Sequence, residues 1–310
     1  MNKPLISVVM LSYRRRNELT KGLESVRRQT YEPKEILVVD NNSGDGTPAF
    51  LAQEFPDVQV LGMSENLGCG GRNRGVEKAR GEFVVTLDND VRFESPDELE
   101  KIALAFAERP QAAVLVFKVL RENTGRLLLR DWCHPRSYAE YADREFETWF
   151  IAEGACAFRR QDFLGAGGYY EPFFIGGEGW DLALRLVDRD RTILYRPEIH
   201  VQHAMAAETR SGRRPYYFMT RNYIWTAFKD YSGWRRWQYI LYGMCVTGFF
   251  SLRTGSLNEM IRGFRDGWKG RAHLPRTPVS ERGWQRMRVL GAQRASWWRR
   301  FRTHWSQSEI

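Results

Sequence analysis

The chain has 310 residues, a formal net charge of +9 and 43% hydrophobic residues. This length can bury a large core, and the composition excludes a disordered or fibrous protein. Its four cysteines are scattered without a Cys-x-x-Cys pair, which excludes a zinc ribbon and a disulfide framework and fits a reducing cytosol. The first residues do not resemble a secretory signal, so we expect a cytoplasmic protein.

Strand and helix patterns alternate along the first 120 residues. In chain order they predict strand 6–11, helix 17–29, strand 35–39, helix 48–55, strand 58–61, helix 70–79, strand 82–87, helix 97–108 and strand 112–120. Such alternation predicts an α/β fold with a mostly parallel sheet covered on both faces. Right-handed crossovers then bring the carboxyl ends of the strands to one edge, where ligands bind.

The second half of the chain changes character. The pattern weakens from 120 to 153 and returns with a predicted helix over 181–187; aromatic and basic residues at helical spacing dominate beyond about 204. The excess charge lies at the end, because residues 253–310 hold 13 Lys and Arg against four acids. The longest uncharged stretch, 237–252, is shorter than the roughly 20 apolar residues of a membrane span and predicts a buried or interfacial helix.

Two predicted strands are followed directly by acids. Asp40 follows strand 35–39, where a carboxylate can accept a hydrogen bond from a pyrimidine N–H; a helix cap by Asp45 or Thr47 is the ordinary alternative for this loop, but it does not account for Asp40. Asp88-Asn89-Asp90 follows strand 82–87. Carboxylates bind hard cations together with diphosphate oxygens, and the buried strand favours that interpretation over a solvated turn.

A glycine-rich segment, 65–75, lies between these two acidic ends. It holds four glycines with Arg72 at the start of a predicted helix. Small residues let the backbone approach a ligand, and a helix amino end with an arginine favours phosphate. A loop entering a helix is the alternative. The three motifs together suggest a nucleotide-sugar site that uses a divalent metal, Mn²⁺ or Mg²⁺.

In order and spacing, these motifs resemble the family 2 inverting glycosyltransferases over roughly residues 6 to 203. The resemblance implies a GT-A catalytic domain over 1–205, with a nucleotide-sugar-binding half at 1–120 and an acceptor-side half at 121–205, followed by a basic, aromatic-rich helical region at 206–310. It further implies donor contacts from Ser12, Tyr13, Arg14, Asp40, Asn42, Asn66, Gly68, Arg72, Asn73, Asp88 and Asn89, with the metal held by Asp88 and Asp90.

The same resemblance bears on the catalytic base. Members of the family usually carry an acidic pair before the helix predicted at 181–187, and one acid deprotonates the acceptor hydroxyl. This chain has Glu178 but Gly179 in the second place, so the base is Glu178 or Asp181. Glu178 is favoured because it precedes the predicted helix on a glycine-flanked loop, whereas Asp181 can cap that helix. His203 matches a family histidine that completes metal coordination; a structural histidine is the alternative.

The implied activity is that of a hexosyltransferase-type glycosyltransferase, which moves a sugar from a nucleotide-diphosphate donor to a glycan or lipid-linked acceptor by metal-assisted single displacement. Near the end of the chain, Trp298, Phe301 and Trp305 share one helical face, whereas Arg299, Arg300 and Arg302 lie mostly elsewhere. That pattern suits peripheral contact with an anionic membrane at its inner face. A helix packed on the domain is the alternative.

Two other classes of protein share some of these features. A nucleotidyltransferase would show a glycine-rich loop after its first strand, and residues 12–16 contain no glycine. A nucleic-acid or anionic-lipid binding protein with an inactive nucleotide-sugar-binding domain is the main alternative, with Gly179 as its hint. Residues 1–252 carry no net charge, which argues against nucleic-acid binding as the main activity, and we expect no nucleic-acid partner.

Overall fold

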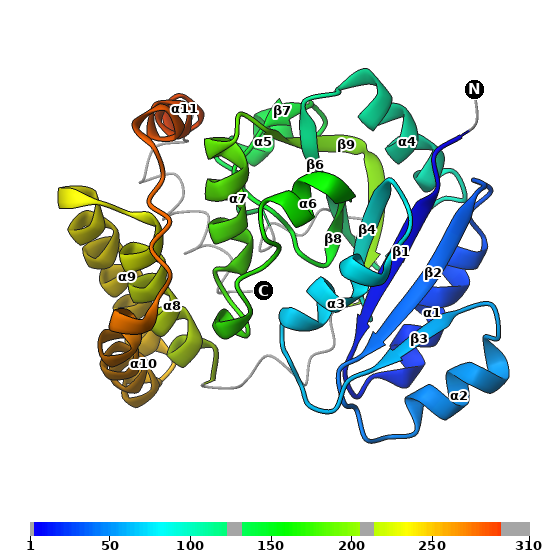
Figure 1. Cartoon of the computed structure of the whole chain (residues 1–310), viewed down its shortest axis with the longest axis horizontal. Helices are drawn as coiled ribbons and strands as arrows, with labels where there is room; N and C mark the ends of the chain where they lie inside the picture. The colour runs from blue at the N-terminus through cyan, green and yellow to red at the C-terminus, as the bar shows by residue number, and fades with distance from the viewer. Residues whose placement is uncertain (1–2, 123–131, 205–213, 293–310) are drawn as a thin grey trace.

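The computed structural model describes residues 3–122, 132–204 and 214–292, and Figure 1 shows how its elements are arranged. The elements of its first half are β1 (Ile6–Ser12), α1 (Arg16–Arg27), β2 (Lys34–Asp40), α2 (Thr47–Glu54), β3 (Gln59–Gly62), α3 (Gly70–Lys78), β4 (Phe83–Asp88), β5 (Val91–Phe93), α4 (Glu98–Glu108) and β6 (Ala112–Arg121). The strands and helices predicted for this half are therefore present, with boundaries that differ by a few residues at most.

The second half contains shorter elements around one long strand, and then helices. They are α5 (Tyr138–Tyr141), β7 (Phe146–Glu147), β8 (Ala155–Arg159), α6 (Arg160–Gly165), η2 (Glu171–Phe173), α7 (Glu178–Asp188), β9 (Thr192–His203), α8 (Arg214–Asp230), α9 (Gly233–Arg253), α10 (Leu257–Gly270), η3 (Arg271–His273) and α11 (Glu281–Ala292). The membrane-facing segment predicted at Trp298 to Trp305 lies outside the described residues, and so does the predicted boundary near residue 205.

One mixed sheet organises the molecule, in the order β3-β2-β1-β4-β8-β6-β9-β5, with β7 paired to β9. The pairs among β3, β2, β1 and β4 are parallel, as is β6 with β9. By contrast, β8 runs antiparallel to both β4 and β6. The expectation of a mostly parallel sheet therefore holds approximately, and holds best in the first half of the chain.

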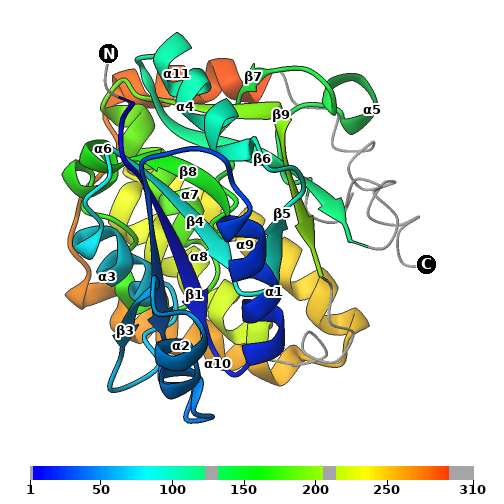
Figure 2. The same cartoon turned by 90° about the vertical axis from the view of Figure 1, so that its right-hand side faces the viewer.

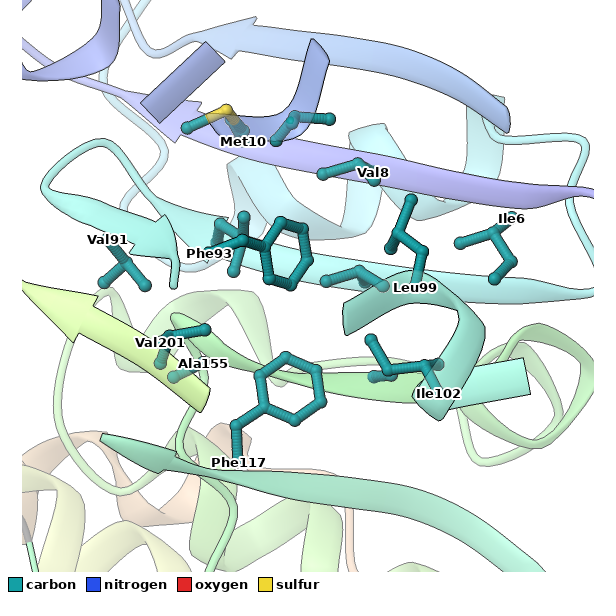
Figure 3. Packing of buried hydrophobic residues seen from close by; sticks show 14 of the residues in the cluster. Ile6, Val8, Met10, Val91, Phe93, Leu99, Ile102, Phe117, Ala155 and Val201 are labelled. Atoms are coloured by element: carbon teal, nitrogen blue, oxygen red, sulfur yellow. The ribbon is translucent and has the colours of Figure 1, made fainter. Parts of the chain in front are cut away.

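Helices cover both faces of this sheet because its central strands are apolar on both sides. Ile6, Val8 and Met10 alternate along β1 toward the face covered by α1 and α4, where Leu99 and Ile102 are buried (Figure 3). The intervening residues of β1 face the other side, where α3, α6 and α7 pack. Figure 2 shows α1 and α3 on opposite sides of β1.

The C-terminal helices pack beside α7, on the side away from β3 (Figure 1). Tyr231 and Trp284 have ring centroids 4.6 Å apart and belong to the same buried cluster as Trp149 and Leu182. The helical region thus shares a hydrophobic core with the α/β part. The helix predicted over 237–252 lies within α9, and no helix in the described parts of the chain is long and apolar enough to cross a membrane.

Candidate active site

Three neighbouring strands end together at one edge of the sheet. In the parallel register Ser12 of β1 is opposite Asp40 of β2, and Leu11 is opposite Asp88 of β4. Because adjacent strands lie about 4.8 Å apart, the backbones of Asp40 and Asp88 are separated by about 10 Å. We call the carboxyl ends of β2, β1 and β4 the strand-end edge. The predicted convergence of acids from two strands at one edge is therefore observed.

Around Asp40, buried acceptors stand without partners. The Asp40 carboxyl is buried; its Oδ2 accepts a hydrogen bond of 3.2 Å from the Ser43 N–H, and its Oδ1 has no partner among the described residues. The Ser12 hydroxyl is likewise buried and unpartnered there. Orphaned buried oxygens are costly unless a ligand or water satisfies them. Asp40 and Ser12 can thus receive donors from a bound molecule.

The loop after β1 lies against the loop after β2. Arg14 has a positive φ of 54°, its N–H donates to the Ser43 hydroxyl at 3.0 Å, and its Nε donates to the Ser43 carbonyl at 3.2 Å. The Arg14 guanidinium lies 5.0 Å from the centre of the Tyr13 ring, which is 38% exposed. Tyr13 directly follows Ser12, and its exposed ring offers a surface on which a flat heterocycle can stack.

Several residues that were predicted to contact the donor instead hold loops in place. The Asn66 Oδ1 accepts hydrogen bonds from Asn41 Nδ2 and from the Gly68 N–H, both at 2.9 Å. Asn42 donates to the Ser64 carbonyl at 3.0 Å. Gly68 has a φ of +57°, and a Cβ there would lie 2.1 Å from the Phe174 carbonyl oxygen. These side chains shape the glycine-rich loop, and Gly68 cannot carry a side chain.

On α3, Arg72 and Asn73 face different partners. Arg72 is buried and pairs with Asp88, and although burial opposes its charge, the Asp88 carboxylate keeps the pKa of the guanidinium above its usual value. Asn73 instead accepts a hydrogen bond from the Tyr169 N–H and donates to the Tyr169 carbonyl, both at 2.9 Å. Arg72 is thus a cation at the strand-end edge, and Asn73 positions the segment before η2.

Asp90 lies between two basic side chains. It forms an ion pair with Arg15, and its Oδ1 is 3.5 Å from the His203 Nε2 at the end of β9. Burial opposes ionisation of Asp90, but His203 and Arg15 outweigh it and lower the pKa of the carboxyl. Asn89, the residue between the two acids, is buried. The structure thus brings Asp90 and His203 together and turns Asp88 to Arg72.

Asp90 and His203 can supply two of the ligands of a divalent cation. A carboxylate oxygen and an imidazole nitrogen are donors that Mn²⁺ accepts, and Mg²⁺ is commonly held by one or two carboxylates together with substrate phosphates. The described residues contain no group of three or more His, Cys, Asp or Glu side chains that could hold a metal. A cation held by Asp90 and His203 would therefore need substrate oxygens as its further ligands.

The predicted loop before α7 is different in the structure. The helix begins at Glu178, three residues earlier than predicted, because Gly177 turns the chain at a φ of 96°. Glu178 is therefore the first residue of the helix rather than part of a flexible loop, and it is only 4% exposed. Asp181 lies one turn inside the helix and does not cap it, which corrects the sequence interpretation of both positions.

Glu178 is a buried carboxyl without a cationic partner in the described chain. Its Oε2 has no hydrogen-bond partner there. Burial, together with the charge of Glu153, raises the pKa of Glu178 to about 8. Burial also raises the pKa of Glu153, whose Oε1 accepts a hydrogen bond of 2.9 Å from the Gly179 N–H. Two acids with raised pKa values therefore stand side by side at the start of α7.

Asp181 has the opposite surroundings. Its carboxyl is fully buried and forms ion pairs with Arg185 and with Lys229 of α8. Burial opposes ionisation, but these two cations outweigh it and keep the pKa of Asp181 below its usual value. Both oxygens are held inside the protein, so Asp181 links α7 to α8 and is poorly placed to accept a proton from a substrate.

Two polar residues of α8, Arg221 and Asn222, lie in the aromatic and basic region that begins beyond about residue 204. In the structure Asn222 of α8 donates to the carbonyls of Phe173, Ile175 and Gly176, and Arg221 donates to the carbonyls of Pro172 and Phe173. These bonds hold the segment that leads into Glu178. Sequence reasoning missed Glu153 as a site residue, because nothing in the sequence shows that it lies beside position 179.

The chain is similar to known glycosyltransferases over much of its length. Residues 7–166, half of the chain, match Glycosyl transferase family 2. A Mycobacterium tuberculosis N-acetylglucosaminyl-diphospho-decaprenol L-rhamnosyltransferase is 28% identical over 273 residues, which are 75% of this chain and 87% of that protein. The O-antigen chain rhamnosyltransferase WbaN of Salmonella anatum is 25% identical over 190 residues, which are 57% and 59% of the two chains.

Other relatives are matched over shorter stretches. The matched regions span 39% and 40% of the lengths of two Bacillus subtilis proteins, EpsH and TuaG, and 59% of the length of WbaN. The chain therefore matches only part of the length of each of these relatives.

Solved structures show the same fold. The mannosyltransferase PcManGT of Pyrobaculum calidifontis, in complex with GDP-Man and Mn²⁺, has a TM-score of 0.59 at 18% identity and covers 94% of this chain and 80% of its own. S. aureus TarS 1–349 with UDP-GlcNAc has a TM-score of 0.60 at 18% identity, covering 90% and 82%. With the family match, these findings confirm the resemblance seen in the sequence. The chain belongs to glycosyl transferase family 2 and has a GT-A-like fold.

Proposed function

We propose that this enzyme transfers a sugar from a nucleoside diphosphate to an acceptor hydroxyl by a single displacement that inverts the anomeric carbon. The observation that carries the proposal is the strand register that aligns Ser12, Asp40 and Asp88 at one edge. The ligands of the similar solved structures, GDP-Man and UDP-GlcNAc, support this class of donor. The name of the mycobacterial relative supports a lipid-diphosphate-linked acceptor.

The contacts of the site support a division of roles. The orphaned oxygens of Asp40 and Ser12 receive donors of the base and ribose, the exposed Tyr13 ring stacks on the base, and Arg72 turns toward the diphosphate. A divalent cation held by Asp90 and His203 would neutralise charge on the departing diphosphate. Glu178 is a better candidate base than Asp181, because its carboxyl has no cationic partner in the described chain.

A thermal-shift panel tests the donor class. The purified enzyme is mixed with UDP, GDP, TDP and their sugars, with and without Mn²⁺. A ligand at 100 times its Kd stabilises the fold by about 2.7 kcal/mol, so one nucleoside diphosphate should raise the Tm clearly. Arg72→Ala should remove most of that shift, whereas the matched change at Arg74, also on α3 but exposed to solvent, should keep it. A flat panel at millimolar ligand would contradict the proposal.

We also propose that the acceptor is reached at a membrane surface through the outer surface of α9 and α10. Exposed apolar side chains share one face of each helix at a spacing of three, four or eleven residues. They are Trp234, Trp237, Leu241 and Leu252 on α9, and Leu257, Ile261 and Phe264 on α10. Helix α9 has three arginines and no acid. Exposed tryptophans with arginines suit the interface of an anionic bilayer.

Vesicle sedimentation tests this surface. We expect the protein to bind vesicles of phosphatidylglycerol more tightly than vesicles of phosphatidylcholine, and Leu241→Glu to weaken the binding at least tenfold. Leu241 is 66% exposed, so the change should not disturb folding. The matched control is Leu104→Glu, at a leucine of α4 that is 55% exposed. Equal binding by both variants, or no vesicle binding by the wild type, would exclude this surface.

A further inference from the structure

Position 179 of α7 has no side chain, and a carboxyl group from elsewhere lies in its place. The Gly179 N–H donates to Glu153 Oε1 at 2.9 Å, and a Cβ on Gly179 would lie only 2.3 Å from that same oxygen. A side chain at 179 and the present position of Glu153 therefore exclude each other. The family's acidic pair is expected at 178 and 179. Only Glu178 of these two positions is acidic in this chain, but the carboxyl of Glu153 lies where the second acid is expected.

We propose that Glu153 is a catalytic carboxylate that completes the acidic pair with Glu178, in place of an acid at position 179. The proposal rests on the proposed function and deepens it. It explains why a chain that carries glycine at 179 retains the rest of the site. It also makes a different prediction from an inactive relative, because an inactive relative would not need Glu153.

The backbone around Glu153 is fixed to the strand-end edge. Strand β8 follows Glu153 and pairs with β4, and the Thr86 hydroxyl donates to the Glu153 carbonyl at 2.7 Å. The Asp88 N–H donates to the Gly154 carbonyl at 3.1 Å, and a Cβ on Gly154 would lie 2.3 Å from Asp88 Cγ. Glu153 thus stands between Asp88, on the proposed diphosphate side, and the start of α7.

The charges around the pair favour proton transfer. The charged groups that face it are Arg72 on α3 and Asp88 at the end of β4. Arg72 is engaged by Asp88, and neither Glu153 nor Glu178 forms an ion pair within residues 3–122, 132–204 and 214–292. The Gly179 N–H stabilises negative charge on Glu153, and Glu178 Oε2 accepts no hydrogen bond in the described chain, so the two carboxyls can share one proton and act together as the base.

The resulting step is balanced. The ionised carboxylate of the pair takes the proton of the acceptor hydroxyl while the acceptor oxygen forms its bond to the anomeric carbon. The bond from that carbon to the diphosphate oxygen breaks, and its electron pair leaves with the diphosphate. The second carboxyl keeps its proton throughout, and the proton gained by the pair is later released to water.

Glu153→Gln separates a chemical role from a structural one. Glutamine keeps an oxygen that can accept the hydrogen bond from Gly179 N–H, so a purely structural Glu153 predicts an active variant. We expect kcat to fall at least 100-fold with an unchanged Kd for the nucleoside diphosphate, in line with the 10²–10⁴-fold contribution of a general base. The control is Glu82→Gln, at a surface glutamate paired with Arg159. A loss of less than tenfold in an otherwise active enzyme overturns the proposal.

Moving the carboxyl back to position 179 gives a second test. Glu153→Ala should be inactive. Adding Gly179→Asp should raise kcat at least tenfold above that of Glu153→Ala, because the oxygen that would collide with the new Cβ is gone. Adding Gly179→Ala instead is the matched control, and its kcat should stay as low as that of Glu153→Ala. Circular dichroism verifies that all three proteins fold, since a Cβ at 179 also lies 2.9 Å from the Ile151 carbonyl. A wild type without transferase activity would instead refute the proposed function.

Discussion

Acids at the strand-end edge and acids at the start of α7 occupy opposite electrostatic surroundings. Asp88 and Asp90 each form an ion pair with an arginine that is close in the fold. Glu153 and Glu178 form no ion pair in the described parts of the chain, and burial raises the pKa of both. An acid kept ionised by a cation suits the binding of charge, whereas an acid with a raised pKa suits proton transfer.

The contrast also separates two neighbours on one helix. Glu178 and Asp181 are three residues apart on α7, and both are buried. Asp181 forms ion pairs with two cations and has a lowered pKa, whereas Glu178 forms no ion pair in the described chain and has a raised pKa. Position on the helix alone therefore does not separate the two candidate bases; the cations that pair with Asp181, Arg185 of α7 and Lys229 of α8, do.

Replacing the titratable carboxyl of Glu178 should have the largest effect. For Glu178→Gln we expect kcat to fall by about 10²–10⁴-fold, because a general base contributes that much. The Kd for the nucleoside diphosphate should not change, since Arg72 pairs with Asp88 and Glu178 forms no hydrogen bond to Ser12 or Asp40 in the described chain. Steady-state kinetics and calorimetric titration measure the two quantities. A variant with normal kcat but weak donor binding would reverse the assignment of the two groups of acids.

Asp181→Asn should act on stability instead. Breaking a buried ion pair by removing one partner typically costs about 3–5 kcal/mol, because Lys229 and Arg185 would be left short of an anion. Urea denaturation measures the loss. Asp97→Asn, at an exposed acid paired with Lys101, serves as the control and should change little. A folded, stable Asp181→Asn protein with a large loss of kcat would restore Asp181 as the base.

How much of the fold and of the site could be predicted from the sequence depends on how far apart in the chain the contacting residues lie. Asp40 and Asp88 follow strands with clear apolar runs, so a local pattern was enough to place them at one edge. Glu153 lies beside Gly179, and Lys229 reaches Asp181, only because β8 and α8 pack against α7. No local pattern encodes those contacts. The start of α7 was also missed, because glycines at 177 and 179 resemble a loop in sequence.

The contact between α8 and the segment before α7 can be weakened directly. Asn222→Leu removes three hydrogen bonds to the carbonyls of Phe173, Ile175 and Gly176, and leaving such buried acceptors unsatisfied should cost about 1–3 kcal/mol of stability. We also expect a lower kcat, because this segment leads into Glu178. Asn258→Leu is the same change at an exposed position of α10 and controls for it. Equal unfolding midpoints would show that the contact is dispensable.

Per pH unit, the smallest expected effect is a difference in how stability depends on pH. The pKa of Glu178 rises from 4.5 to about 8 on folding, so between these values the folded protein binds more protons than the unfolded chain. Stability attributable to this group is present below about pH 4.5 and is lost as the pH rises toward 8, by up to about 1.4 kcal/mol per pH unit. Glu178→Gln cannot titrate and should therefore lose less stability between pH 5 and pH 8.

Urea denaturation of both proteins at pH 5, 6, 7 and 8 measures that difference. Asp230, whose pKa is also raised to about 8 by burial and by Asp181, contributes a similar slope to both proteins and cancels in the comparison. Parallel curves for the wild type and Glu178→Gln would mean that Glu178 is already ionised at pH 5. In that case the acids at the start of α7 would resemble Asp88 and Asp90 after all, and the electrostatic contrast between the two regions would disappear.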